Sequence, residues 1–269
     1  MSVRIQEVIA KDGLRLPVHI SSHGRPLLIV PGIANEPRAS WDAVREHLEP
    51  HLTVAVVHRR GALGDPLSDL TMEQEFDDVV EVAKALGPEV DVLGHSSGAL
   101  YALGAALLTT NLRRLILYEP PLEPLSPNAD EYRERVTKLD ALLRAGDIEG
   151  VYDAWWTVYL GLPREVAEGI MASPIDPGIR PMAKYIPREI KAHLAWEIDP
   201  TQFADITAPT LFLLGEETPM DGDLAGMLPL LTGVIPNLTV RKIPGQGHFA
   251  PSFAPKLFAD IVLEFLRTE

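Results

Sequence analysis

One serine stands in a pattern suited to nucleophilic attack. The segment Gly94–Gly98 reads Gly-His-Ser-Ser-Gly and fits G-x-S-x-G, with Ser96 at its centre. It follows the short apolar run Val90–Leu93 and precedes the Ala- and Gly-rich segment Ala99–Leu108, so a strand, a sharp turn and a helix are predicted in that order. Such a turn needs glycine on both sides of the serine and exposes the serine oxygen. The pattern therefore predicts a nucleophilic hydroxyl at Ser96.

A serine nucleophile needs a base to take its proton, and His248 has the most suitable position. It lies in the sequence GQGHF, shortly after the predicted strand Leu238–Ile243, and the flanking glycines leave its ring free on a loop. When a serine stands on a strand-to-helix turn of this kind, the histidine comes last in the chain. Five other histidines precede the motif, His193 lies in a helical stretch, and His95 is expected to pack beside the serine.

The elements that must position these residues alternate between strand and helix patterns. Strands are predicted at Arg4–Ile9, Leu14–Ile20, Leu27–Val30, Thr53–Val57, Val90–Leu93, Leu115–Tyr118, Thr210–Leu214 and Leu238–Ile243. Helices are predicted at Ser40–Leu48 (with Ser40 as N-cap), Met72–Leu86, Ala99–Leu108, Asp223–Leu231 and Pro255–Leu266. This alternation predicts an α/β fold with a mostly parallel, eight-stranded sheet flanked by helices.

Residues 121–205 interrupt the alternation. They carry helical patterns and no convincing strand, and they hold Trp155, Trp156 and Trp196, three of the four tryptophans. We therefore expect a core of residues 1–120 and 206–269, with a helical cap or lid of residues 121–205 inserted after the sixth strand. Aromatic-rich walls are typical of small-molecule sites, so the lid is expected to line a pocket for a small apolar or aromatic substrate.

Composition narrows the remaining classes. The net charge of −14 disfavours nucleic acid and, mildly, polyanionic substrates. The chain has no cysteine, which excludes disulfides and thiolate chemistry. It has no apolar run of membrane-spanning length and no signal-peptide core, so we expect a cytoplasmic protein without a membrane span, as a monomer or homodimer. With no spaced His/Asp/Glu cluster and no G-x-G-x-x-G, neither a metal nor another cofactor is expected.

Over nearly its whole length the chain resembles the α/β-hydrolase superfamily. The motifs that carry the resemblance are Pro31-Gly32, Trp41-Asp42, His58–Gly61, Gly94–Gly98, Pro209–Gly215 and Gly245–His248. The resemblance implies a triad in which Ser96 is the nucleophile and His248 the base. It also implies an oxyanion hole made by the backbone N–H groups of Ser97 and Ile33, with Ala34 as the alternative to Ile33.

The acid of the triad departs from the family pattern. It usually stands three residues after the glycine that ends the seventh core strand, here Gly215, and that position holds Thr218. We favour Glu119, after the sixth strand, where certain haloalkane dehalogenases have their acid and where a buried carboxylate would reach His248. Glu119 could instead anchor the lid by pairing with an arginine. Three more carboxylates close to Thr218 are candidates for the acid: Glu216, Glu217 and Asp221.

Two adjacent arginines, Arg59 and Arg60, occupy a loop that usually begins with aspartate in this family. Guanidinium groups commonly tie loops together, so a structural role is expected. Asp65 and Asp69, in the same loop, are their expected partners.

The activity expected is hydrolysis of a carboxylester, lactone or thioester. The same triad also serves carbon–carbon bond hydrolysis, perhydrolysis and lyase chemistry, because a fold does not fix a function. Dehalogenases and epoxide hydrolases of this fold need a carboxylate nucleophile, which Ser96 argues against. A third hypothesis is a ligand-binding or receptor protein without turnover, which Thr218 at the usual acid position favours.

Overall fold

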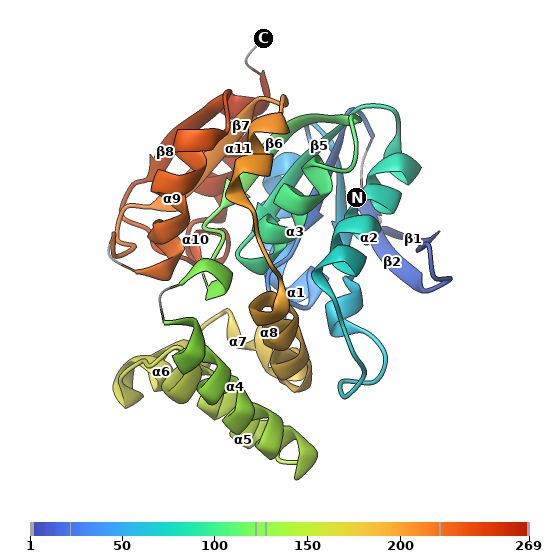
Figure 1. Cartoon of the computed structure of the whole chain (residues 1–269). Coiled ribbons are helices and arrows are strands. Elements are labelled where there is room, and N and C mark those ends of the chain that lie inside the picture. The colour runs from blue at the N-terminus through green and yellow to red at the C-terminus, as the bar shows by residue number, and fades with distance from the viewer. Residues whose placement is uncertain (1–2, 22, 122, 127, 221, 268–269) are drawn as a thin grey trace.

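The computed structural model describes residues 3–21, 23–121, 123–126, 128–220 and 222–267. The strands within them are β1 (Arg4–Ile9), β2 (Arg15–Ser21), β3 (Pro26–Val30), β4 (Thr53–Val57), β5 (Val90–His95), β6 (Leu112–Tyr118), β7 (Thr210–Gly215) and β8 (Leu238–Ile243). In this part of the chain they form an eight-stranded sheet in the order β1-β2-β4-β3-β5-β6-β7-β8 (Figure 1). β2 pairs antiparallel with β1 and β4, and the other pairs are parallel. The predicted α/β class with a mostly parallel sheet is confirmed.

Helices cover both faces of this sheet. They are α1 (Pro37–Leu48), η1 (Arg60–Ala62), α2 (Met72–Leu86), α3 (Ser97–Ala106), α9 (Asp223–Val234), α10 (Ala250–Phe253) and α11 (Pro255–Arg267). Along β3, Leu27 and Ile29 pack into the core under α1 and α11, while Leu28 and Val30 pack into the core under α2 and α3. Both faces of the strand are therefore buried, which explains its continuous apolar sequence.

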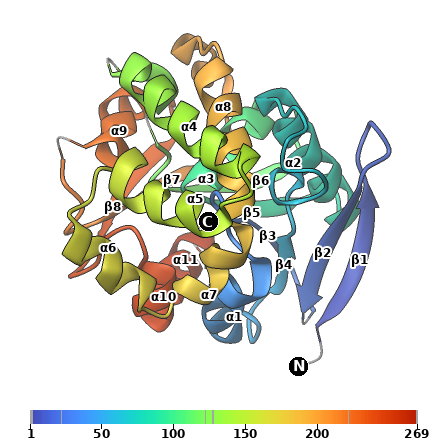
Figure 2. The ribbon, with the colours of Figure 1, turned by 90° about the horizontal axis from the view of Figure 1, so that it is seen from below.

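The described residues between β6 and β7 form helices and no strand. The elements are η2 (Glu123–Leu125), α4 (Ala129–Arg144), α5 (Ile148–Ala154), η3 (Trp155–Tyr159), α6 (Arg164–Met171), α7 (Asp176–Ile179), η4 (Arg180–Tyr185), α8 (Ile186–Ala195) and η5 (Pro200–Asp205). We call this part of the chain the helical insertion. Figure 1 shows α4, α5 and α6 below the sheet, and Figure 2, seen from below, shows α4, α5 and α8 across its middle. A separate apolar core joins the insertion to Ile33 and Ala34, which follow β3.

The first helix does not begin where the sequence predicted. It starts at Pro37, and its N-cap is Glu36, whose carboxylate accepts a hydrogen bond from the Ala39 N–H at 2.6 Å. Proline suits the first helical position because the N–H that it lacks has no partner there. The prediction of Ser40 as N-cap is therefore wrong, because this serine lies inside the first turn.

Crossing a lipid bilayer takes a helix of about 20 mostly apolar residues. None in the described part of the chain combines the necessary length with the necessary apolarity.

Candidate active site

Ser96 lies on a tight turn between β5 and α3. Its backbone has φ 55° and ψ −128°, in the positive-φ region that residues other than glycine rarely adopt. A Cβ at Gly98 would lie 2.5 Å from the carbonyl oxygen of Pro31, and a Cβ at Gly94 would lie 2.5 Å from the Cα of Ala99. Both positions therefore require glycine, as the sequence predicted. The turn places Ser96, half-buried, at the wall of a cavity.

The structure brings Glu119 to His248. The Nδ1 of His248 lies 2.6 Å from Oε2 of Glu119, and the carboxylate is fully buried. Its other oxygen accepts hydrogen bonds from the Gly215 N–H at 2.7 Å and from the Thr218 hydroxyl at 2.6 Å. These hydrogen bonds and the contact with His248 satisfy both oxygens of a carboxylate that is closed off from solvent. His248 lines the same cavity as Ser96.

The remaining candidate acids lie elsewhere or outside the description. Glu216 is exposed and accepts a hydrogen bond from the Gly245 N–H at 2.9 Å. Glu217 is exposed as well, and Asp221 lies outside the described residues. The carboxylate that the structure places on the imidazole is therefore that of Glu119, and the ring nitrogen it contacts is the one that a triad acid orients.

Two backbone segments reach the cavity wall beside Ser96. Ser97 opens α3, so its N–H belongs to the positive end of that helix, and Ile33 follows β3; both line the cavity. The alternative donor, the N–H of Ala34, donates instead to Oε1 of Glu189 at 3.3 Å. This hydrogen bond favours Ile33 over Ala34 as the donor.

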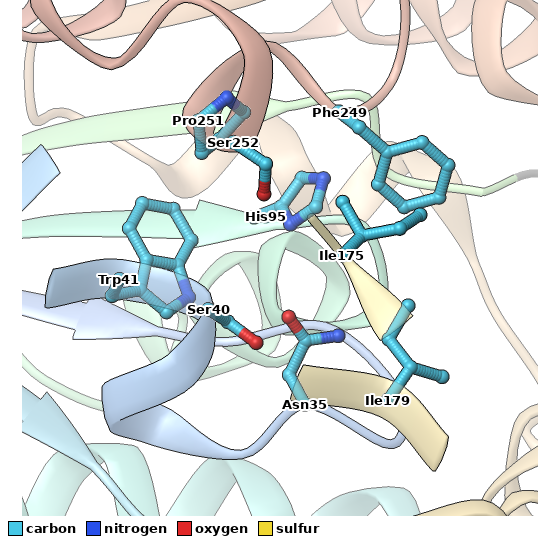
Figure 3. A pocket seen from close by; sticks show the side chains of 9 residues that line it. All are labelled: Asn35, Ser40, Trp41, His95, Ile175, Ile179, Phe249, Pro251 and Ser252. Atoms are coloured by element: carbon cyan, nitrogen blue, oxygen red, sulfur yellow. The ribbon is translucent and has the colours of Figure 1, made fainter. Parts of the chain in front are cut away.

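His95 supports the loop that carries His248. Its Nε2 lies 3.0 Å from the carbonyl oxygen of His248, and its ring stacks on Tyr118 with centroids 5.1 Å apart. Burial, together with the neighbouring His248, holds the pKa of His95 well below its usual range, so this ring stays neutral. In Figure 3 it lies in a small pocket with Trp41 on one side and Phe249 on the other. The sequence placed it beside the serine but did not predict its contact with the base.

The cavity that contains Ser96 and His248 has a volume of about 490 Å³. Much of its apolar wall comes from the helical insertion, through Trp155, Trp156, Leu160, Leu162, Val166 and Ile170. A space of this size and lining suits a small molecule with an apolar or aromatic body.

One side of the cavity is polar, which the sequence patterns did not predict. Glu123 accepts a hydrogen bond from the Tyr159 hydroxyl at 3.1 Å, and its other oxygen lies 3.3 Å from Nδ1 of His193. The Nε2 of His193 is 2.7 Å from the Tyr101 hydroxyl. Asp223, at the start of α9, lines the same cavity. These residues come from separate segments without a motif, so only their tertiary arrangement reveals them.

The predicted partners of Arg59 and Arg60 are wrong. Asp65 and Asp69 are exposed and neither carboxylate pairs with these arginines. The partners are acids from other segments: Glu75 and Glu189 for Arg59, and Asp78 and Asp12 for Arg60. Arg59 is itself buried, and its guanidinium requires partners that are buried with it.

The groups that line the cavity are of the kinds needed for acid–base and nucleophilic chemistry. They offer a hydroxyl, an imidazole bound to a buried carboxylate, and backbone N–H groups for a developing negative charge. Across the described residues, His, Asp and Glu side chains nowhere gather in threes or more as a metal site would need. The absence of a metal or other cofactor stays a prediction.

Comparison with known proteins agrees with this fold. A model of the alpha/beta hydrolase family matches residues 27–261, and the chain therefore belongs to that family. This confirms the resemblance drawn from the motifs, and family membership supports a hydrolase. The comparison with curated proteins found no match.

Solved structures match over nearly the full chain. An alpha/beta hydrolase from Sphaerobacter thermophilus is 29% identical, with a TM-score of 0.80, over 97% of this chain and 100% of that one. A hydrolase from Pseudomonas aeruginosa is 23% identical, with a TM-score of 0.79, over 98% and 99%. A thermophilic esterase from Thermogutta terrifontis is 21% identical, with a TM-score of 0.76, over 98% of each chain. At 23% and 21% sequence identity, the Pseudomonas aeruginosa and Thermogutta terrifontis structures show that the fold is shared.

Proposed function

We propose that this chain is a cofactor-independent serine hydrolase that cleaves an ester-type bond of a small apolar or aromatic substrate. The bond is a carboxylester, lactone or thioester. The observation that carries the proposal is the shared cavity of Ser96 and His248, with the imidazole bound at 2.6 Å to the buried Glu119. Serine as the nucleophile argues against dehalogenase and epoxide hydrolase chemistry, which use a carboxylate on this fold.

The proposed reaction uses these groups in turn. His248 takes the proton of the Ser96 hydroxyl as the oxygen attacks the substrate carbonyl carbon. The carbonyl oxygen becomes negative and accepts hydrogen bonds from the N–H groups of Ile33 and Ser97. His248 then protonates the leaving oxygen or sulfur, the C–O or C–S bond breaks, and an acyl-enzyme remains. Water, deprotonated by the same imidazole, attacks the acyl carbon, and the imidazolium returns its proton to the Ser96 oxygen as the acid is released. Glu119 stabilises the imidazolium in both halves.

In this proposal residues 121–205 are a cap on a core of residues 1–120 and 206–269. The cap supplies the aromatic and aliphatic wall of the cavity, including Trp155 and Trp156. It would exclude water from the acyl-enzyme and select an apolar acyl or aryl group.

Two competing functions use the same cavity differently. In the first, the triad cleaves a carbon–carbon bond, forms a peracid or acts as a lyase, and product analysis separates these reactions from ester hydrolysis. In the second, the chain is a ligand-binding protein without turnover. The hydrogen bonds around Glu119 weigh against this second function, because they supply the buried acid that Thr218 cannot.

The test is the intact mass of the protein after incubation with a fluorophosphonate probe. Phosphonylation of a serine requires an activated nucleophile beside an oxyanion hole. We expect one adduct on the wild type and none on Ser96→Ala. A folded wild type that acquires no adduct would overturn the proposal and favour the binding role. Screening of ester, lactone and thioester substrates on the same two proteins then defines the bond.

A further inference from the structure

The peptide group between Gly32 and Ile33 is held from its carbonyl side. The Nη2 of Arg59 donates to the carbonyl oxygen of Gly32 at 2.7 Å. This peptide is trans, so its N–H, which belongs to Ile33, points away from Arg59. The segment also packs on the nucleophile, since a Cβ at Gly32 would lie 3.0 Å from the Cβ of Ser96. Arg59 therefore determines where one N–H beside the serine points.

The next peptide groups are also engaged. Ala34 has φ 51°, an unfavourable left-handed conformation for alanine, and its N–H donates to Oε1 of Glu189 at 3.3 Å. The side-chain amide of Asn35 donates to the carbonyl oxygen of Ile33 at 2.8 Å. Hydrogen bonds on both sides of the Ile33 N–H thus hold the loop in a conformation that it would not favour alone.

The two residues that hold the loop form an ion pair. Arg59 Nη2 lies 2.7 Å from Oε2 of Glu189, and both side chains are buried. A second carboxylate, Glu75, lies 3.0 Å from Nη1 of Arg59. Burial lowers the pKa of Arg59, but the two carboxylates outweigh this and raise it, so the guanidinium stays charged. A Cβ at Gly61 would lie 2.7 Å from both carboxylates, so a side chain at this position would displace them from Arg59.

Glu189 comes from the helical insertion, on α8, and its neighbour fixes that helix to the core. The Arg188 guanidinium donates to the carbonyl oxygens of Gly61, Leu63 and Asp65 at 3.2, 2.8 and 2.6 Å. The position of Glu189 relative to the loop after β3 therefore depends on the packing of α8 against the loop after β4.

We propose that Arg59 and Glu189 are positioning residues for the oxyanion hole. Together they hold Gly32 to Ala34 so that the Ile33 N–H faces the substrate oxygen that becomes negative. Arg59 also polarises this peptide group through its carbonyl, which strengthens the N–H as a donor. This inference rests on the proposed function, because it assigns a role in the reaction at Ser96. It makes the helical insertion part of the catalytic geometry as well as a wall of the cavity.

The experiment compares Arg59→Met/Glu75→Gln with Glu75→Gln alone. Above about pH 8, where Glu75 is ionised, the double variant removes one positive and one negative charge, so the net buried charge is unchanged and the comparison is made there. We expect kcat to fall roughly 10- to 100-fold with KM little changed, less than the 10²–10³-fold of a lost donor, because the Ile33 N–H remains. Affinity for an alkylboronic acid, whose tetrahedral adduct on Ser96 occupies the hole, should fall by a similar factor. For Glu75→Gln alone, kcat and boronate affinity should both stay within about threefold of the wild-type values. Arg59→Lys should lose less of both than the double variant, because lysine retains the positive charge but lacks the planar fork of the guanidinium.

Further measurements distinguish a loss of positioning from a loss of folding or stability. Circular dichroism and thermal unfolding establish that each variant is folded. If the double variant does not fold, Glu189→Gln replaces it, because that change leaves Arg59 and Glu75 as a neutral pair. The pH profile of kcat/KM should be unchanged, since neither residue contacts His248. Wild-type turnover and boronate affinity in folded variants would overturn this inference, whereas a wild type that the fluorophosphonate does not label would overturn the proposed function itself.

Discussion

At the scale of single residues, the most informative feature is the Glu119 carboxylate that contacts the His248 ring. Glu119 lies after β6, and Thr218, at the family's usual acid position, donates to it at 2.6 Å. We expect Glu119→Gln to lower kcat by roughly 10²–10⁴-fold, because an amide does not stabilise the imidazolium and favours the wrong ring tautomer. Steady-state kinetics on an ester substrate measures this. Glu217→Gln, which changes an exposed acid nearby, should leave kcat unchanged, and the reverse result would reassign the acid.

A second prediction at this scale concerns Glu75 and pH. Burial, opposed by the Arg59 charge, raises the pKa of Glu75 to about 7 from an ordinary 4.5. Between these values the folded protein holds a proton that the unfolded chain has released, so this group lowers stability as pH rises to about 7. Relative to Glu75→Gln, the wild type should lose roughly 1–3 kcal/mol of unfolding free energy between pH 5 and pH 8 in urea denaturation. Glu73→Gln, on the exposed side of the same helix, should show no such divergence; parallel pH curves for wild type and Glu75→Gln would refute the prediction.

At the scale of elements, the turn between β5 and α3 has no room for a side chain. A methyl at Gly98 would lie 2.5 Å from the carbonyl oxygen of Pro31, and backbone cannot move aside cheaply. Gly98→Ala should therefore lower Tm by several degrees and reduce kcat at least 10-fold, because the turn must open and displace Ser96. Calorimetry measures the change in Tm, and steady-state kinetics on an ester substrate measures the change in kcat. Gly169→Ala in α6 is the matched control: its Cβ meets nothing within 4 Å, so stability should rise slightly.

The sequence predicted local elements, but it did not predict contacts between elements that are far apart in the chain. The strands and the turn around Ser96 were predictable because period and glycine spacing are local signals. The partners of Arg59 were not, because Glu189 is far away in the chain, on α8, and choosing acids close in sequence led to Asp65 and Asp69. Contacts between an insertion and the core depend on packing geometry, which leaves no periodic trace in the chain.

At the scale of the whole molecule, charge bears on the choice of substrate. The chain has a net charge of −14, and the residues that line the cavity in the described part of the chain include Glu123 and Asp223 but no lysine or arginine. Burial and the neighbouring Glu123 carboxylate raise the pKa of Asp223, which indicates that anions are disfavoured there.

This predicts discrimination between matched substrates. A neutral diester should have a kcat/KM roughly 10-fold or more above that of the corresponding mono-acid ester, because like charges repel in a partly enclosed space. Added salt should narrow the difference. The double variant Glu123→Gln/Asp223→Asn should reduce the difference in kcat/KM between the two substrates further. The control Glu216→Gln/Glu217→Gln removes two carboxylates from the surface and should leave this difference unchanged. Equal rates for the two substrates in the wild type would contradict the prediction.

The hydrogen bond between Thr218 and Glu119 has a consequence for redesign of the site. It means that the usual position of the family's acid and the position of Glu119 are one hydrogen bond apart, close to the same imidazole. A hydroxyl at residue 218 donates to the buried Glu119, whereas a second carboxylate at that distance would repel it. The two positions are therefore alternatives for one buried acid, and a design that moves the acid to residue 218 must remove the carboxylate at residue 119 in the same step.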